Sequence, residues 1–112
     1  MTTKRRRKGG DALPPLPAYV HSLLGPVRVR FESEPKGNRG EVVTAYALTT
    51  HREIVIEESL PLTQKWQALY HEWMHFVLYD SGVANVLEDW QNEAVCDAVG
   101  TSFAFARIQE GR

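Results

Sequence analysis

The sequence predicts an α+β domain in which a three-stranded antiparallel sheet packs on two long helices. Apolar and polar residues alternate over Val27–Phe31, which is the period-two pattern of a half-buried strand. Between Leu62 and Tyr79, by contrast, apolar residues recur every three or four positions, as on an amphipathic helix. With 112 residues, the chain has the length of one domain and can bury a core without disulfides. We therefore expect a sheet half followed by a helical half.

The first twelve residues differ in composition from the rest of the chain. They contain the five consecutive cations of Lys4–Lys8 and the flexible pair Gly9–Gly10. Such a segment cannot bury enough apolar surface to fold. We expect residues 1–12 to form a basic, disordered tail and residues 13–112 to form the domain.

The domain is predicted to open with a proline-rich stretch and a short helix. Leu13–Pro17 contains three prolines and is expected to be extended. Ala18–Leu24 has the length of two helical turns and is followed by Gly25 and Pro26, which end helices. His21 lies on this segment, where a surface or packing role is expected.

Three short segments are predicted as the strands of the sheet. The first is Val27–Phe31, and a loop rich in proline and glycine follows it at Glu34–Gly40. Val42–Thr49 and Glu53–Glu57 are then joined by a turn at Thr50–Arg52, which is typical of a β-hairpin. An edge strand of this sheet could hold an extended peptide by strand addition.

Two long segments are predicted as helices. The first, Leu62–Tyr79, ends at Ser81–Gly82, because glycine commonly follows a helix C terminus. Asn85 with Glu88 resembles a capping pair that opens the second helix, which continues to about Ile108.

Charge is distributed unevenly along the chain. The formal net charge is −1, but Lys4–Lys8 contributes +5, so the chain from Asp11 onwards carries −6. No lysine or arginine lies between Lys65 and Arg107, whereas six carboxylates do: Glu72, Asp80, Glu88, Asp89, Glu93 and Asp97. Such a region attracts cations, a divalent metal among them.

Composition also bears on the cellular compartment. Cys96 is the single cysteine, so an internal disulfide is excluded and a reducing compartment is favoured. The sequence has no secretory hydrophobic region and no membrane span. We expect a cytoplasmic protein of a bacterium or of a phage-infected host. Cys96 itself is expected to be a small buried residue rather than a nucleophile.

The run His71-Glu72-Trp73-Met74-His75 forms an HExxH motif on the first long helix. Two histidines four positions apart project from the same face of a helix, close enough to bind one Zn²⁺. They lie opposite the apolar stripe and are expected to face away from the core. Glu72 can reach a water activated by the metal, take its proton and later pass that proton to a leaving amine. Two surface histidines without a ligand role are the alternative interpretation.

The second helix carries a further pair at the same spacing, Glu93 and Asp97. Gly100 and Ala104 lie on or near their face, and such small residues would let the two helices approach closely. Glu93 could then be a third metal ligand, with one position left open for water. Asp97 could accept the free N–H of a ligating imidazole and fix its tautomer. A solvated acidic face is the alternative.

The run Asn92-Glu93-Ala94-Val95-Cys96-Asp97, shortly after the HExxH motif, resembles the NExxxD segment of thermolysin-like gluzincins. The resemblance covers about Leu62–Phe105 and implies a minimal zincin-like fold, one Zn²⁺ per chain and zinc metalloendopeptidase activity. It assigns His71, His75 and Glu93 to the metal, Glu72 to the general base and Asp97 to the support of a histidine. The chain is also similar to minimal gluzincins and to the compact IrrE/ImmA-like metallopeptidases of bacteria and phages.

The chain departs from the thermolysin-like pattern after its second motif. In those enzymes a further subdomain completes the cleft and contributes a histidine to the transition state, but no histidine follows His75 here. The group that stabilises the oxyanion is therefore unassigned. Tyr79, one turn beyond His75, is a candidate, and His51 and Arg52 are others. A partner protein that completes the cleft is a further option.

Three functions from different classes fit these observations. The preferred interpretation is a metallopeptidase that acts on peptide or protein substrates. A non-catalytic module that keeps the metal for stability or partner binding, as a phage or bacterial structural or regulatory protein, is favoured by the missing oxyanion donor. Glu72 argues against it, because a structural zinc site needs no base. A nucleic-acid binder rests on Lys4–Lys8 alone, and steep loss of binding with salt would be its signature.

Overall fold

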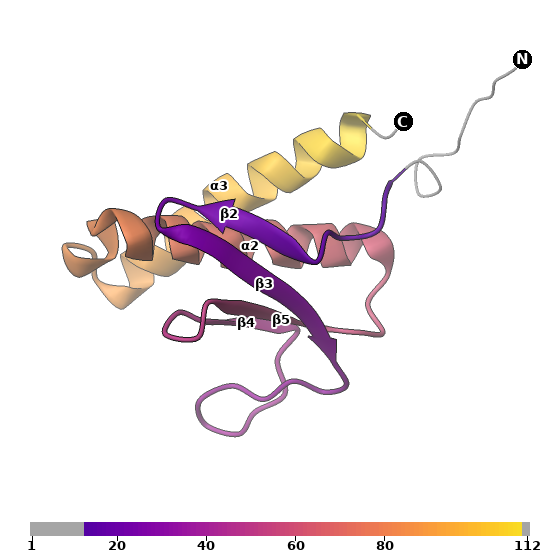
Figure 1. Ribbon diagram of the computed structural model, residues 1–112, viewed down its shortest axis with the longest axis horizontal. Helices are drawn as coiled ribbons and strands as arrows, with labels where there is room; N and C mark the ends of the chain where they lie inside the picture. Colours follow the sequence, from indigo (N-terminus) through magenta and orange to yellow (C-terminus); the bar gives the residue numbers. More distant parts are fainter. Residues whose placement is uncertain (1–12, 111–112) are drawn as a thin grey trace, which may run out of the picture.

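A four-stranded mixed sheet packs on one side of helix α2, and helix α3 packs on α2 as well (Figure 1). The computed structural model describes residues 13–110, so the predicted basic tail at 1–12 lies outside the described residues. The elements in chain order are β2 (Tyr19–Ser22), β3 (Gly25–Glu32), β4 (Ala45–Leu48), β5 (Glu53–Glu57), α2 (Leu62–Ser81), the 3₁₀ turn η1 (Val83–Asn85) and α3 (Asp89–Glu110). The predicted α+β class is confirmed.

The sheet has the strand order β2-β3-β5-β4. β2 pairs antiparallel with β3, β4 pairs antiparallel with β5, and β3 pairs parallel with β5. The hairpin of β4 and β5 was predicted, but the prediction of three antiparallel strands is wrong. Ile54, Val55 and Ile56 are all fully buried, so β5 is apolar on both faces and takes an inner position. β4, whose four residues are half-buried, lies at the edge.

Tyr19–Ser22 forms a strand, so the helix predicted at Ala18–Leu24 is wrong. Val20 is buried in the core, whereas its neighbours Tyr19 and His21 are exposed, which is the alternation of a strand. Gly25, at φ 128°, makes the turn into β3 in a conformation that other residues rarely adopt. A segment this short gains more stability by pairing in a hairpin than by forming an isolated helical turn, because the first turn of a helix is unfavourable in free energy.

The ends of the helices follow local signals. α2 stops at Gly82, which has the left-handed φ of 83°, as predicted. The predicted capping pair of Asn85 and Glu88 is wrong, because Asn85 lies in η1 and α3 begins at Asp89. Instead the backbone N–H of Glu88 donates to the Gln91 side chain at 2.9 Å, so the cap lies three residues later than predicted. In residues 13–110 neither helix is apolar over a length that could cross a membrane.

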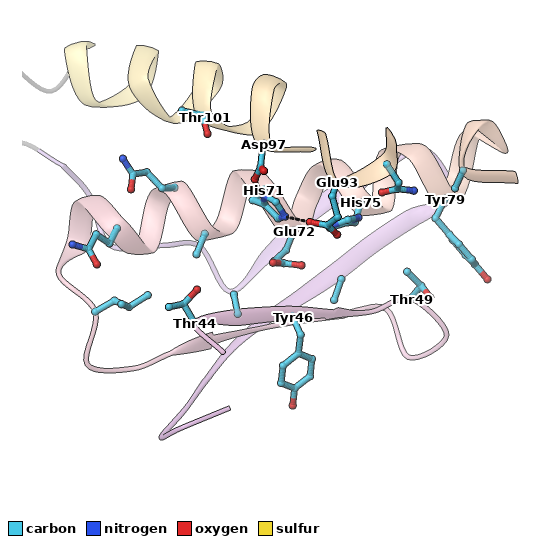
Figure 2. Close-up of a pocket in the computed structure, with 18 residues that line it drawn as sticks. Thr44, Tyr46, Thr49, His71, Glu72, His75, Tyr79, Glu93, Asp97 and Thr101 are labelled. Carbon is cyan, nitrogen blue, oxygen red and sulfur yellow. Dashed lines mark ion pairs between the residues drawn. The ribbon is translucent and has the colours of Figure 1, made fainter. Parts of the chain in front are cut away.

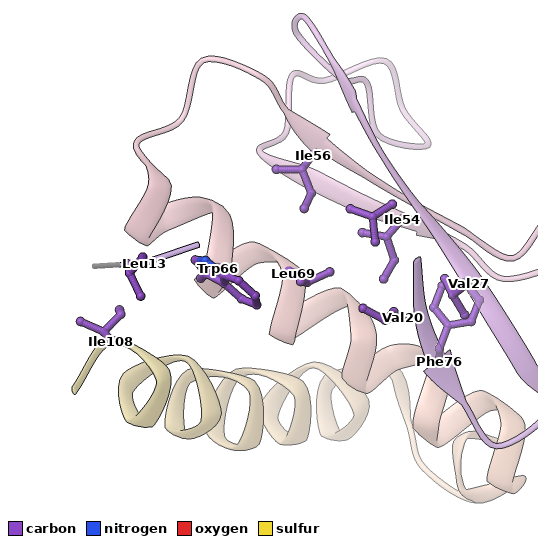
Figure 3. Packing of buried hydrophobic residues seen from close by; sticks show 10 residues of the cluster. Leu13, Val20, Val27, Ile54, Ile56, Trp66, Leu69, Phe76 and Ile108 are labelled. Atoms are coloured by element: carbon purple, nitrogen blue, oxygen red, sulfur yellow. The ribbon is translucent and has the colours of Figure 1, made fainter. Parts of the chain in front are cut away.

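The core lies between α2 and the sheet and extends to the ends of the chain described (Figure 3). Its buried members are Leu13, Val20, Val27, Val29, Ile54, Ile56, Trp66, Leu69, Phe76 and Ile108. The indole N–H of Trp66 donates to the Pro14 carbonyl at 2.9 Å. The Arg107 guanidinium lies 4.6 Å from the centre of the Trp66 ring. Trp66 thus joins the proline-rich stretch to the start of α2 and the end of α3.

Candidate metal centre

α2 presents different side chains to its two neighbours. Leu69 and Phe76 are fully buried in the core beside the sheet. His71 and His75 lie on the side of α2 toward α3, and their side chains are 23% and 18% exposed (Figure 2). The histidines therefore lie outside the core, as predicted, but they are half-buried beneath α3. This placement brings them within reach of the carboxylates on α3.

His71, His75 and Glu93 form a cluster across the two helices. One carboxylate oxygen of Glu93 lies 3.2 Å from His71 Nε2, and the other lies 3.0 Å from His75 Nε2. One ligand atom from each residue can be chosen so that all three lie within 4.8 Å of one another. Two imidazole nitrogens and one carboxylate oxygen are a donor set that suits a divalent metal with an open position. The three side chains could therefore hold a metal ion.

Asp97 contacts the opposite side of the His71 ring. Its carboxylate lies 2.9 Å from Nδ1, whereas Glu93 lies at Nε2. When the Nδ1–H group of His71 donates a hydrogen bond to Asp97, the lone pair of Nε2 is free for the cluster. Burial lowers the pKa of His75, which favours the neutral imidazole that binds metals. Asp97 thus orients the ring of His71, and burial favours the neutral form of His75.

Glu72 is the one charged residue of residues 13–110 that is buried when backbone and side chain are taken together, at 8% exposure. Burial, and then the negative charges of Glu93 and Asp97, raise its pKa to about 8. In Figure 2 its carboxyl lies below the histidines, toward β4. A cation held by the cluster would favour the ionised carboxylate again, because opposite charges attract. The protonation of Glu72 would therefore change if a metal ion bound to His71, His75 and Glu93.

A cleft of about 790 Å³ runs beside the cluster, between β4 on one side and α2 and α3 on the other (Figure 2). His71, Glu72, His75, Glu93 and Asp97 all line it. So do four alanines: Ala45 and Ala47 of β4, Ala68 of α2 and Ala84 of η1. These alanines were not identified from the sequence. The small residues of Ala45–Leu48, a strand close to the predicted active-site helix, could have indicated an open cleft there. Their short side chains leave the space next to the cluster open.

The three candidates for an oxyanion donor have different surroundings. Tyr79 lines the cleft and is 47% exposed, but its ring is directed away from His75 (Figure 2). His51 is exposed in the β4–β5 turn, where Nδ1 lies 3.2 Å from the Thr50 hydroxyl. The Arg52 guanidinium donates to both carboxylate oxygens of Asp80, at 2.7 and 3.0 Å. Of the three candidates, Tyr79 lines the cleft, whereas Arg52 forms an ion pair with Asp80.

Cys96 lies on α3 between the two carboxylates and is fully buried. Its thiol donates to the Asn92 side-chain oxygen at 3.6 Å. Burial, followed by the charge of Glu93, raises its pKa to about 12. The side chain stays a thiol near neutral pH, so the prediction of a small buried residue is confirmed and a nucleophilic role is disfavoured.

Comparison with family models, with curated proteins and with solved structures gives no match for this chain. The gluzincin resemblance therefore rests on the two sequence motifs.

Proposed function

We propose that this chain is a zinc-dependent peptidase of minimal gluzincin type, with one Zn²⁺ held by His71, His75 and Glu93. The observation that carries the proposal is the convergence of three ligand atoms within 4.8 Å on the wall of a cleft. Two histidines and a glutamate with a fourth position open are the ligand set of thermolysin. The buried carboxyl of Glu72 beside this cluster adds a group that a purely structural metal site does not need.

The chain's own residues have defined roles in the proposed reaction. When bound, Zn²⁺ supplies Lewis acidity that polarises a carbonyl group and lowers the pKa of a water molecule. Glu72 accepts the proton of the attacking water and delivers it to the leaving amine. The Asp97 carboxylate accepts a hydrogen bond from the Nδ1–H group of His71, 2.9 Å away, and so keeps the ring in the orientation that serves the cluster.

Substrate binding is assigned to the space between β4 and α2. β4 is an edge strand, and among residues 13–110 β5 is the one strand that pairs with it. An extended peptide can therefore pair with the free edge of β4 and cross the cluster. Ala45, Ala47 and Ala68 leave room in the cleft for a substrate side chain. The proposal includes the cytoplasmic location, which the single cysteine of the sequence favours.

The test combines metal content with peptide cleavage. Purified wild-type protein is expected to contain one zinc per chain and to cleave members of a peptide library. Glu72→Gln should retain the zinc and lose cleavage, whereas His75→Ala should lose both. Glu88→Gln is the matched control, because Glu88 is an exposed carboxylate outside the cluster, and it should behave as wild type. A wild-type protein that binds no zinc would contradict the proposal.

A non-catalytic metal-binding module is the second candidate. The observation in its favour is that Tyr79 is directed away from His75, while Arg52 is paired with Asp80. Neither side chain then offers a donor to a developing oxyanion, and such donors contribute several kcal/mol to acyl transfer. One zinc per chain with no cleavage by any form would favour this module over the peptidase.

A further inference from the structure

Gly100 lies directly against the backbone of α2 at His71. A Cβ atom built on Gly100 would lie 2.9 Å from both Cα and N of His71, and 3.1 Å from the carbonyl carbon of Tyr70. Nonbonded carbon atoms are at their optimal separation near about 3.5–4.0 Å. Because all three neighbours are backbone atoms, they cannot move aside as a flexible side chain can. α3 can therefore approach α2 this closely only with glycine at this position.

The close approach occurs on the same face of α3 as the carboxylates of the cluster. Asp97 precedes Gly100 by three residues and Glu93 precedes it by seven, so the three positions lie along one side of the helix. Asp97 lies 2.9 Å from His71 Nδ1, and Glu93 lies 3.2 Å from Nε2. An outward shift of α3 by roughly 0.5–1 Å would relieve a Cβ contact at position 100. The same shift would stretch the Asp97 contact beyond hydrogen-bonding distance.

We propose that Gly100 is a positioning residue for the metal centre. By carrying no side chain, it sets the separation of α2 and α3 at which Asp97 orients the His71 ring and Glu93 completes the ligand set. This inference rests on the metal-binding part of the proposed function and not on its peptidase part. It concerns the placement of a helix, so metal affinity is its direct readout.

The test compares Gly100→Ala with Ala104→Gly. Ala104 is fully buried on the same side of α3, but it lies eleven residues, or about three turns, beyond Glu93. Zinc affinity is measured by competition with a chromogenic chelator, and the apo proteins are unfolded with urea. We expect Gly100→Ala to bind zinc at least tenfold more weakly and to have a lower urea midpoint. Ala104→Gly should also have a lower midpoint, but its zinc affinity should stay within twofold of wild type.

Asp97→Ala separates positioning from a general loss of stability. In the wild-type background it should weaken zinc binding, because His71 loses its orienting partner. In the Gly100→Ala background it should have little further effect, since that contact is already lost. Fully additive losses in the two backgrounds would contradict the inference. If Gly100→Ala is unfolded in buffer, the titrations are made in concentrated sucrose, which favours the compact state.

The outcomes distinguish this inference from the proposed function. Alanine is a better helix former than glycine, so a methyl group that fits would raise the urea midpoint and leave zinc affinity unchanged. That result in a wild type that binds zinc would overturn the role of Gly100 alone. A wild type without zinc affinity would overturn both the metal centre and the role of Gly100. Zinc binding without cleavage would overturn the peptidase proposal and leave the role of Gly100 standing.

Discussion

Arg52 and Asp80 form a bidentate ion pair at the end of α2, and the Asp80 side chain is completely buried. The same guanidinium donates to the carbonyl of Gly25 at 3.0 Å, and Asp80 accepts from the backbone N–H of Leu24 at 3.1 Å. The pair therefore joins the β4–β5 turn, the β2–β3 turn and α2. It also holds Arg52 at φ 55°, a conformation that non-glycine residues seldom adopt.

Asp80→Asn is expected to destabilise the protein by roughly 3 kcal/mol, because it leaves a partly buried guanidinium without its anion. Arg52 and its hydrogen bonds hold the pKa of Asp80 well below its usual range. Deprotonated Asp80 therefore contributes stability above the unfolded-state pKa of about 4, and that contribution is lost as the pH falls toward the lower folded-state pKa. Urea unfolding between pH 7 and pH 3 measures both effects. An Asp80→Asn protein with the wild-type midpoint at pH 7 would contradict this role.

Glu72 is expected to give the metal-free protein the opposite pH dependence. Its pKa is raised from 4.5 to about 8, so the folded state holds the proton over a range in which the unfolded chain has released it. Stability must then fall as the pH rises from about 4.5 to about 8, by up to about 1.4 kcal/mol per pH unit. Urea unfolding in the presence of a chelator measures this slope. Glu72→Gln should flatten it, and an equally steep slope in the variant would assign it to other groups.

Trp66 is expected to be among the most sensitive core positions. Trp66→Ala should cost about 3–5 kcal/mol, because it leaves a cavity between α2, the proline-rich stretch and Ile108. Trp66→Phe should cost about 1–2 kcal/mol, since it loses the hydrogen bond to the Pro14 carbonyl. Trp90, which is 66% exposed, provides the matched control, and Trp90→Phe should change stability by less than about 0.5 kcal/mol. The free energy of unfolding in urea is the measurement.

Asp97→Asn is expected to weaken zinc binding by about 10- to 100-fold with little effect on the stability of the metal-free protein. The reason is that an amide offers His71 Nδ1 a weaker and differently shaped acceptor than the carboxylate now 2.9 Å away. Chelator competition measures the affinity, with Glu88→Gln, at the residue just before α3, as a control. Equal affinities for wild type and Asp97→Asn would show that the ring is oriented by something else.

The parts of the site that could be predicted from the sequence are those fixed by helix periodicity. His71 and His75 share a face of α2, and Glu93 and Asp97 share a face of α3, because residues four apart always do. The small residue Gly100 further indicated that the two helices could meet. The spacing of the four residues and the small residue Gly100 together predicted which four side chains would lie together, although their metal and their chemistry remain predictions.

What could not be predicted depends on contacts between distant residues. The inner position of β5 agrees with the burial of Val55 on the second face of the sheet. No residue within Glu53–Glu57 indicates that β3 is the strand with which β5 pairs in parallel. Likewise, Arg52 in the predicted hairpin turn was a candidate for stabilising the oxyanion. Its partner Asp80 lies 28 residues away, and the turn of β2 and β3 that completes their contacts was itself predicted as a helix.

The strand order also bears on the kinetics of folding. The sheet consists of two local hairpins, β2–β3 and β4–β5, and the parallel pairing of β3 with β5 is the join between them. Each hairpin closes a short loop and is expected to form in roughly microseconds. The parallel pairing of β3 with β5 instead brings together residues that a long loop separates, such as Arg28 and Glu53. Closing that loop carries an entropy cost before any contact compensates for it. The slow event in folding is therefore expected to be the association of the two preformed hairpins through the parallel pairing of β3 with β5.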